Sequence, residues 1–421
     1  MTTSPFSSSS LGQVFTSLYA NRNIFTPARR KKIEEFQRSQ GQNLDLLAKQ
    51  LVDESYVPSY KGILIPQLNA DGTIKKHRGI TPLDSRDWIV QRILLSELNR
   101  TIGDHAKTDS SYGREARKDE TNPRSPSQCC KTIGSRRKEL PVAFRADLVD
   151  FFPSVCRLTL LNELKNMLPS NWNYLWLLEK IVNTDSEPPS SATATQVTSF
   201  WPKGLGVHQG TVIAPFFANI VMAPWDRQWE GKVPLFRYVD DWLILGDTPS
   251  EISNLSEEMV KSLPPGIKCH LDNPKKCDLY VAGTEIDFLG LNITGDGVTR
   301  PSLDAFTKHK TILLDRRLKS TNVVDLAMSL IQYNDAWKNY YSDAGLTQPL
   351  KLAADKRVAT QIDEWLKSKG VSQNASIHIK KLLQEFKPQK SAKSKDSISF
   401  GLTNGEIAPC EIDESISKIV G

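Results

Sequence analysis

The chain has 421 residues, of which 39% are hydrophobic and 24% charged, and its formal net charge is +6. This composition is ordinary for a globular protein, and the length favours several packed subdomains over one continuous core. The mild basic excess is compatible with a polyanionic partner but does not by itself establish one.

The cysteine spacing and the apolar stretches argue against a zinc-binding protein and against a membrane protein. Six cysteines show no CxxC pairing and no spacing typical of a zinc site, which favours reduced thiols over a structural metal. The most apolar stretch, "TVIAPFFANIVMAPW", is too short for a membrane span and is interrupted by Pro215, Asn219 and Pro224. With no signal-peptide pattern, we expect a cytoplasmic protein without a membrane partner.

The first 140 residues mix helical and extended patterns. The Ser-rich start, "MTTSPFSSSS", is expected to be loosely ordered, and residues 28–55 have a helical pattern with a basic opening. Residues 61–82 predict two strands around a turn at Asp71-Gly72, and the apolar spacing over 86–102 predicts a helix. The basic stretch 111–140 is expected to form loop and helix on a surface.

From residue 142 the predicted elements alternate between strand and helix. A strand over 142–149 leads into a helix over 158–168, residues 183–203 are polar and loop-like, and residues 210–229 predict a buried helix. Residues 235–245 predict a pair of short strands, and residues 248–263 an amphipathic helix. Further strands are predicted around 268–273 and 285–293, and the pattern after residue 302 is mostly helical, with a Lys-rich stretch at 380–395.

Two adjacent carboxylates, Asp240 and Asp241, interrupt the pair of strands in "FRYVDDWLIL". Like charges at ~4 Å repel by roughly 4 kcal/mol at an effective dielectric constant of 20, and a divalent cation removes that cost. Asp147 ends the strand in "FRADLVDFF" and could supply a third carboxylate. Three such groups suit a pair of metal ions ~3.5–4 Å apart, the arrangement used for phosphoryl or nucleotidyl transfer.

Each carboxylate also has a simpler interpretation when it is taken alone. An Asp-Asp pair in a turn is usually just solvated, and Asp147 could be a strand terminus or a helix cap. The ordered set of all three favours the functional interpretation.

Four segments carry a resemblance to a known family. "ADLVDFFPSV", "GLGVHQGTVIAPFFANIV", "FRYVDDWLIL" and "IDFLGLNI" occur in the order of motifs A, B, C and E of reverse transcriptases. "YVDD" resembles the YxDD box, while "HQG" and "APFFANI" stand where many relatives have PQG and SPxxAN. Upstream, residues 65–94 and "SYGREAR" are similar to the fingers of group II intron and related bacterial enzymes. The resemblance covers residues 61–345.

The resemblance implies an α+β right-hand polymerase with fingers, a palm built on an antiparallel sheet packed on helices, and an α-helical thumb. It divides the chain into an N-terminal helical extension (1–60), fingers (61–146), palm with fingers insertions (147–300), thumb (301–371) and a basic C-terminal extension (372–421). It also implies that Asp147, Asp240 and Asp241 are catalytic and bind two Mg²⁺ ions, with Mn²⁺ as a substitute. The Leu148 carbonyl is implied as a further ligand.

Two parts of the nucleotide pocket follow from the same resemblance. Phe151 falls where an aromatic ring blocks a ribose 2′-hydroxyl by steric clash and so favours deoxynucleotides; the alternative is a core phenylalanine. Gln209 and Gly210 would shape the pocket, with the glycine allowing close approach of the backbone. His208 replaces the usual proline, which leaves the stiffness of this loop open.

Three cations are candidates for contacts with the triphosphate. Lys76 and Arg78 would grip the incoming phosphates, although Lys75 competes with Lys76 for that register and a solvated charge run is an alternative. Lys276, in "NPKKCDL", falls in the motif D segment and would act as a general acid toward pyrophosphate, with an ordinary surface lysine as the alternative.

The helical stretch after the palm resembles the thumb of group II intron-like enzymes. Arg316, Arg317 and Lys319 would meet the template–primer backbone. An aromatic cluster is expected to form thumb core rather than a base-stacking platform; its members are Tyr333, Trp337, Tyr340 and Tyr341.

The layout predicts an RNA-directed DNA polymerase of the stand-alone, defence-associated or abortive-infection kind. No downstream endonuclease, integrase or RNase H pattern is evident in the sequence. The expected partners are dNTPs, an RNA template that could be a dedicated noncoding RNA, the DNA product, and a protein partner or a second copy of the chain. Alternatives are a retron or group II intron-derived enzyme, template-independent synthesis, an inactive RNA-binding scaffold, and an RNA-dependent RNA polymerase.

Overall fold

The computed structural model describes residues 4–22, 27–69, 73–114, 120, 124–342, 344–373 and 377. The chain forms two compact units, the first made of Met1–Tyr19, Lys31–Gln67 and Lys76–Thr299, and the second of Ala20–Arg30, Leu68–Lys75 and Arg300–Gly421. The turn expected at Asp71-Gly72 and nearly all of the extension expected over 372–421 lie outside the described residues.

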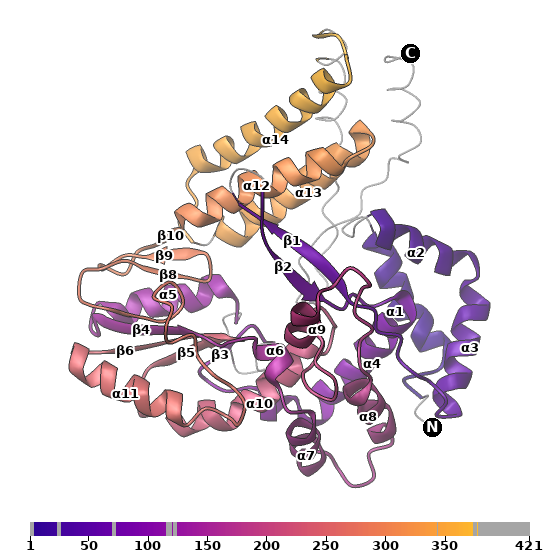
Figure 1. Ribbon diagram of the computed structural model, residues 1–421, viewed down its shortest axis with the longest axis horizontal. Coiled ribbons are helices and arrows are strands. Elements are labelled where there is room, and N and C mark those ends of the chain that lie inside the picture. The colour runs from indigo at the N-terminus through magenta and orange to yellow at the C-terminus, as the bar shows by residue number, and fades with distance from the viewer. Residues whose placement is uncertain are drawn as a thin grey trace. The chain divides into compact units, whose positions relative to one another are not determined.

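A five-stranded sheet organises the first unit, in the order β3-β5-β6-β4-β7. Its strands are β3 (Ser111–Tyr112), β4 (Val142–Asp147), β5 (Leu235–Tyr238), β6 (Asp241–Gly246) and β7 (Asp278–Tyr280). Strand β3 pairs with β5 in parallel, and the other pairs are antiparallel. Every residue of β6 after Asp241 is buried, because helices cover both sides of the sheet. Figure 1 shows α5 (Pro126–Arg137) and α11 (Pro249–Lys261) on these opposite sides.

Helix α10 is the buried helix expected over 210–229 and spans Ala214–Trp229. Pro215 lies in its first turn, where a missing backbone N–H costs nothing. In the described residues up to 261, the helices not yet named are α1 (Ser8–Ala20), α2 (Pro27–Arg38), α3 (Gln40–Val52), α4 (Ser85–Ile102), α6 (Phe151–Ser154), α7 (Arg157–Met167), α8 (Leu175–Asn183) and α9 (Ala194–Phe200), with the 3-10 helix η2 (Gly103–Ala106).

Five short strands form two smaller sheets. Strands β1 (Ile63–Leu68) and β2 (Ile74–Ile80) form a two-stranded sheet, as the sequence predicted. Strands β8 (Ile286–Phe288), β9 (Leu291–Ile293) and β10 (Thr299–Pro301) form a three-stranded sheet in the order β10-β9-β8.

Most of the described residues of the second unit belong to three helices: α12 (Leu303–Lys319), α13 (Val323–Ser342) and α14 (Gln348–Ser368). Their shared apolar core includes Leu313, Leu326, Leu330, Ile362 and Leu366, each no more than 5% exposed. Trp337 and Tyr341 are buried too, as expected for core aromatics. Within the described residues, no helix is both long enough and apolar enough to cross a membrane.

The chain start is more ordered than its composition suggested. Helix α1 begins at Ser8, inside the serine run, and Phe6 is only 4% exposed. The ring of Phe6 packs edge-on against Tyr174 with 5.1 Å between centroids. An aromatic anchor therefore overrides the local polarity.

Three further expectations were wrong. Residues 183–203 are not only loop, because α9 begins in a capping box formed by Thr193 and Gln196. Residues 268–273 do not form a strand: Cys269 makes a single bridge to Leu148, and the chain then turns at Asn273. The stretch 111–140 is not simply surface, since α5 buries Cys129, Cys130 and Ile133 completely.

Candidate active site

The three predicted carboxylates come from the adjacent ends of two strands. Asp147 is the last residue of β4 and lies directly opposite Asp241, the first residue of β6. The N–H of Leu148 donates to the carbonyl oxygen of Asp240 over 3.0 Å. Residues opposite each other in an antiparallel pair have Cβ atoms roughly 4.5–5.5 Å apart. Residues separated by about ninety positions in sequence therefore meet at one end of the sheet.

Asp240 is carried by a two-residue turn. Tyr238 pairs with Asp241, so Val239 and Asp240 alone connect β5 to β6. Such tight hairpins require a positive φ at the first turn residue, and Val239 has a φ of +59°. The turn places both aspartates at the tip of the hairpin.

Basic side chains surround these carboxylates. Lys276 Nζ lies 2.6 Å from Asp147 Oδ1, and His270 Nε2 lies 3.4 Å from the same oxygen. Arg145 Nη2 lies 3.4 Å from Asp241 Oδ1. Lys276 was predicted from the motif D segment, whereas Arg145 and His270 were not predicted. Arg145 is two residues before Asp147 on the same strand, so the two side chains share a face of the sheet, a weak signal that sequence could have supplied.

Burial and mutual repulsion make two of the carboxylates resist ionisation. Burial, with the charges of Asp240 and Asp147 adding to it, raises the pKa of Asp241 to about 6, although Arg145 opposes the rise. Burial also raises the pKa of Asp240, and the charge of Asp147 contributes. A cation placed among these carboxylates would stabilise their ionised forms.

The donor set suits a hard divalent cation. Carboxylate and carbonyl oxygens are the ligands that Mg²⁺ prefers, and it usually keeps further positions open for water and phosphate. Among the described residues, no three His, Cys, Asp or Glu side chains lie arranged so that they could hold a metal ion as they stand. The three aspartates therefore supply suitable donor oxygens, but their present arrangement is not a preformed metal site.

Phe151 is the first residue of the short helix α6, which begins four residues after Asp147. Asp150 adopts a left-handed conformation with a φ of 41°, which turns the chain from Asp147 into α6. Phe151 is 2% exposed and its ring lies 5.6 Å from that of Phe152. Both interpretations of Phe151, gate and core ring, are compatible with this burial.

The loop before α10 is held against α6 and β2. Gly206 has a φ of +77°, and an added Cβ would lie 2.7 Å from the Pro153 backbone. Gln209 accepts through its carbonyl oxygen from the Thr81 N–H, and Arg78 Nε donates to its side-chain oxygen over 3.2 Å. Gly210, with a φ of +93°, lies 3.4 Å (measured from an ideal Cβ) from Ile80. The structure thus joins Arg78 and Gln209 directly.

The remaining candidates of this region differ in exposure. Lys76 is exposed and lies two residues before Arg78 on β2, so both project from the same strand face, while Lys75 alternates to the other. His208 is buried, with its Nε2 2.7 Å from the Thr184 carbonyl and its ring 4.9 Å from that of Tyr60. Burial lowers the pKa of His208. A packed, neutral histidine therefore stands where relatives have proline.

The thumb cations named from sequence have partners within their own unit. Arg316 Nη1 donates to the Ser329 carbonyl over 2.6 Å, and Arg317 forms an ion pair with Glu364. Lys319 lies 2.8 Å from Asp315. Their contact with a nucleic-acid backbone stays a prediction.

Comparison with known proteins identifies the family. The family model of reverse transcriptase (RNA-dependent DNA polymerase) matches residues 67–293, more than half of the 421-residue chain. The chain belongs to the reverse transcriptase family. Its fold is the α+β right-hand polymerase, with the five-stranded sheet and its covering helices as the palm.

Other comparisons add less about this reverse transcriptase. No curated protein matches it. Among solved structures, it is similar to the telomerase of Candida albicans in complex with a TWJ fragment of telomeric RNA, at 13% identity and a TM-score of 0.35, over 78% of this chain and 63% of that one. An apo telomerase from Candida tropicalis, truncated from its C-terminal domain, matches at 13% identity and a TM-score of 0.39, over 58% of this chain and 55% of that one. The chain thus spans less than two thirds of either.

Proposed function

We propose that this reverse transcriptase extends a nucleic-acid 3′-hydroxyl with dNTPs, using Asp147, Asp240 and Asp241 to hold two divalent metal ions. The observation that supports this proposal most is the pairing of Asp147 with Asp241 across the β4–β6 ladder. Beside that pair, the Leu148 N–H donates a hydrogen bond to the Asp240 carbonyl oxygen. Mg²⁺ or Mn²⁺ bound there would lower the pKa of the attacking hydroxyl and neutralise the departing pyrophosphate.

The chain's own residues would bind and orient the substrates. Arg78, held by Gln209, presents a guanidinium that can take a phosphate bidentately, and exposed Lys76 lies on the same face of β2. Phe151 would limit the space under the sugar. Lys276, which neutralises Asp147 in the metal-free protein, would be released toward the pyrophosphate as the ions take over that role.

We also propose that the template is RNA, that a dedicated noncoding RNA supplies it, and that synthesis takes place in the cytoplasm as part of anti-phage defence. The support for the defence role is the resemblance of the motifs to stand-alone bacterial enzymes. The boundaries given above for extension, fingers, palm, thumb and C-terminal extension belong to this proposal.

Primer extension on an RNA template tests the chemistry. Asp240→Asn with Asp241→Asn removes two carboxylates at nearly constant shape, and we expect kcat to fall by about 10³-fold or more, as when a dominant electrostatic group is removed. Asp247→Asn is the matched control: it lies exposed just beyond the far end of β6 and should retain full activity. Undiminished extension by the double variant would rule out the proposed site.

The defence role is tested separately by plating phage on cells that carry the wild-type chain or the double variant. Loss of protection with the variant, together with a single recurring RNA in the nucleic acid that copurifies, supports the proposal. Full protection by the inactive variant would favour the RNA-binding scaffold instead.

A further inference from the structure

The turn that carries the catalytic pair has an unusual residue at its most constrained position. Primed two-residue turns usually place glycine, asparagine or aspartate where φ is positive, yet Val239 occupies that position with a φ of +59°. A β-branched residue in this region is a genuine outlier. Such conformations persist only where the surrounding structure over-determines them. Something must therefore hold Val239 in place.

Arg237 makes the contact that does so. Its Nη1 donates to the Val239 carbonyl oxygen over 3.1 Å and also to Asn219 Oδ1 over 3.2 Å. Its side chain is 0% exposed, and it projects from the second-last position of β5, two residues before Val239. Because a guanidinium is planar, the direction of this donor is fixed by whatever fixes the rest of the group.

The other edge of the guanidinium is clamped by Asp226 of α10. Nε and Nη2 of Arg237 donate to Oδ1 and Oδ2 of Asp226 over 2.8 and 2.6 Å, a bidentate pair in which both side chains are 0% exposed. Fully buried ion pairs add little to stability compared with apolar residues of the same volume, so stability alone explains this one poorly. A role in holding the Arg237 guanidinium in a single orientation explains the pair better.

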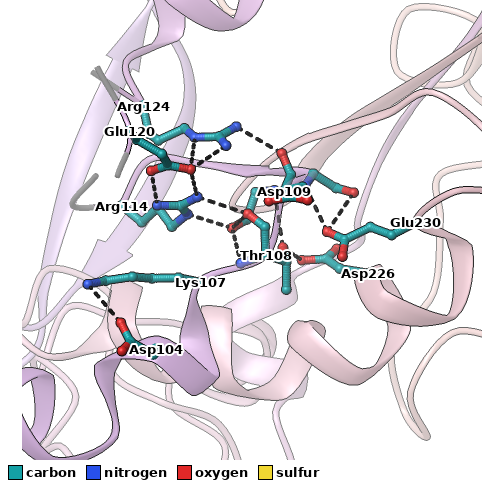
Figure 2. A network of polar contacts seen from close by, with 11 residues as sticks. Asp104, Lys107, Thr108, Asp109, Arg114, Glu120, Arg124, Asp226 and Glu230 are labelled. Carbon is teal, nitrogen blue, oxygen red and sulfur yellow. Dashed lines mark hydrogen bonds and ion pairs between the residues drawn. The ribbon is translucent and has the colours of Figure 1, made fainter. Parts of the chain in front are cut away.

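The ion pair of Arg237 and Asp226 is itself held by a polar network (Figure 2). Thr108 Oγ1 donates to Asp226 Oδ2 over 2.7 Å, and Arg114 Nη2 donates to the Thr108 carbonyl over 2.9 Å. Arg114 and Arg124 both bind Glu120. A continuous series of hydrogen bonds and ion pairs thus runs from Arg124, Glu120 and Arg114 through Thr108, Asp226 and Arg237 to the catalytic turn.

We infer that Arg237 is a positioning residue: by holding the Val239 carbonyl it keeps the turn in the strained conformation that carries Asp240 and Asp241 to Asp147. The inference rests on the proposed function, because it takes these aspartates as the metal ligands. Without that contact the turn would relax, and the two carboxylates would leave the geometry in which they share ions with Asp147.

Arg237→Lys tests the inference. An ammonium still neutralises Asp226, but it cannot grip both carboxylate oxygens and the Val239 carbonyl at once. A displacement of about 1 Å near the reacting groups can cost about 100-fold in rate, so we expect kcat to fall by about 10- to 100-fold while KM for the primer–template stays within about threefold. We also expect binding of Mn²⁺ alone, measured by calorimetry, to weaken by about fivefold or more.

A double-mutant cycle separates positioning from general support of the fold. Val239→Gly removes the steric cost of the positive φ, so in that background Arg237→Lys should reduce kcat by less than about threefold. A merely structural role would give the same loss in both backgrounds. If Arg237→Lys does not fold, the neutral pair Arg237→Gln with Asp226→Asn leaves no buried charge unpaired and is measured in the same cycle.

The outcomes are distinguishable. A folded Arg237→Lys variant with wild-type kcat and Mn²⁺ affinity, or an equal loss with and without Val239→Gly, overturns the positioning role. The Asp240→Asn, Asp241→Asn variant is run beside it: if that variant still extends primers, it is the proposed metal site that fails.

Discussion

Asp147 and Asp241, at the end of the palm sheet, each have basic neighbours that lower the cost of keeping the carboxylate buried. Lys276 and His270 face Asp147, and Arg145 faces Asp241. Burial still raises the pKa of Asp241 to about 6, so the basic neighbours compensate only part of the cost. Negative charge therefore remains uncompensated at the site, and a divalent cation can neutralise it.

Phe151→Val tests whether the buried ring at the start of α6 is a steric gate. A smaller side chain leaves room for a 2′-hydroxyl, so we expect discrimination against ribonucleotides to fall by about 10-fold or more, with dNTP kcat/KM within about tenfold of wild type. Phe152→Val is the matched control, since it removes the same volume from the neighbouring ring and should leave discrimination unchanged. The measurement is single-nucleotide incorporation with paired dNTP and NTP. Unaltered discrimination in Phe151→Val would assign Phe151 to the core.

At the scale of elements, the sequence predicted those features that depend on residues close together in the chain. The acidic pair between two short strands, and Asp147 at the end of a third segment, predicted where the carboxylates lie, because strand ends follow from side-chain alternation and turn residues. The approach of His270 to Asp147 could not be predicted, since it depends on register between segments distant in sequence, and Arg145 was signalled only by its position two residues before Asp147. Helix α9 could have been predicted, because the Thr193–Gln196 capping box marks a helix start in spite of the polar composition around it.

The helices of the second unit contain a pH-sensitive contact. His309 of α12 is fully buried; its Nε2 lies 3.0 Å from Asn334 Oδ1, and its ring lies 4.5 Å from that of Trp337. Burial lowers the pKa of His309 to about 4, although Asn334 opposes the shift and Arg357 and Asp355 exert opposite, smaller effects. In the unfolded chain a histidine titrates near about 6.5. The unfolded state therefore binds more protons between these values, and stability must fall as the pH falls from about 6.5 toward 4.

His309→Gln should remove this dependence. Glutamine stays neutral and can still donate to Asn334, so the variant should lose less stability between pH 7 and pH 4.5, by roughly 2–3 kcal/mol. His105→Gln, at an exposed histidine of η2, is the matched control and should behave as wild type. Urea unfolding followed by tryptophan fluorescence at several pH values provides the measurement. Parallel curves for the His309 variant and wild type would contradict the assignment.

At the scale of the molecule, the region that matches the family model and the helical bundle belong to different units. Residues 67–293, which match the family model, lie almost entirely in the first unit, whereas α12, α13 and α14 lie in the second. Each unit has its own buried core: Leu243 lies in the palm sheet and Leu330 in the helical bundle, both 0% exposed. Two cores of this kind can unfold separately.

Leu330→Ala and Leu243→Ala form a matched pair that tests this separation. Each removes the same atoms from a fully buried site, at a cost of about 2–5 kcal/mol to the unit that contains it. We expect calorimetry of the whole chain to show two transitions, with each variant lowering one of them by about 4 °C or more and leaving the other within about 1 °C. A single transition that both variants lower equally would show that the two units unfold as one. Because Leu330 lies far in sequence from every proposed metal ligand, Leu330→Ala should also bind Mn²⁺ as wild type does at temperatures below its first transition.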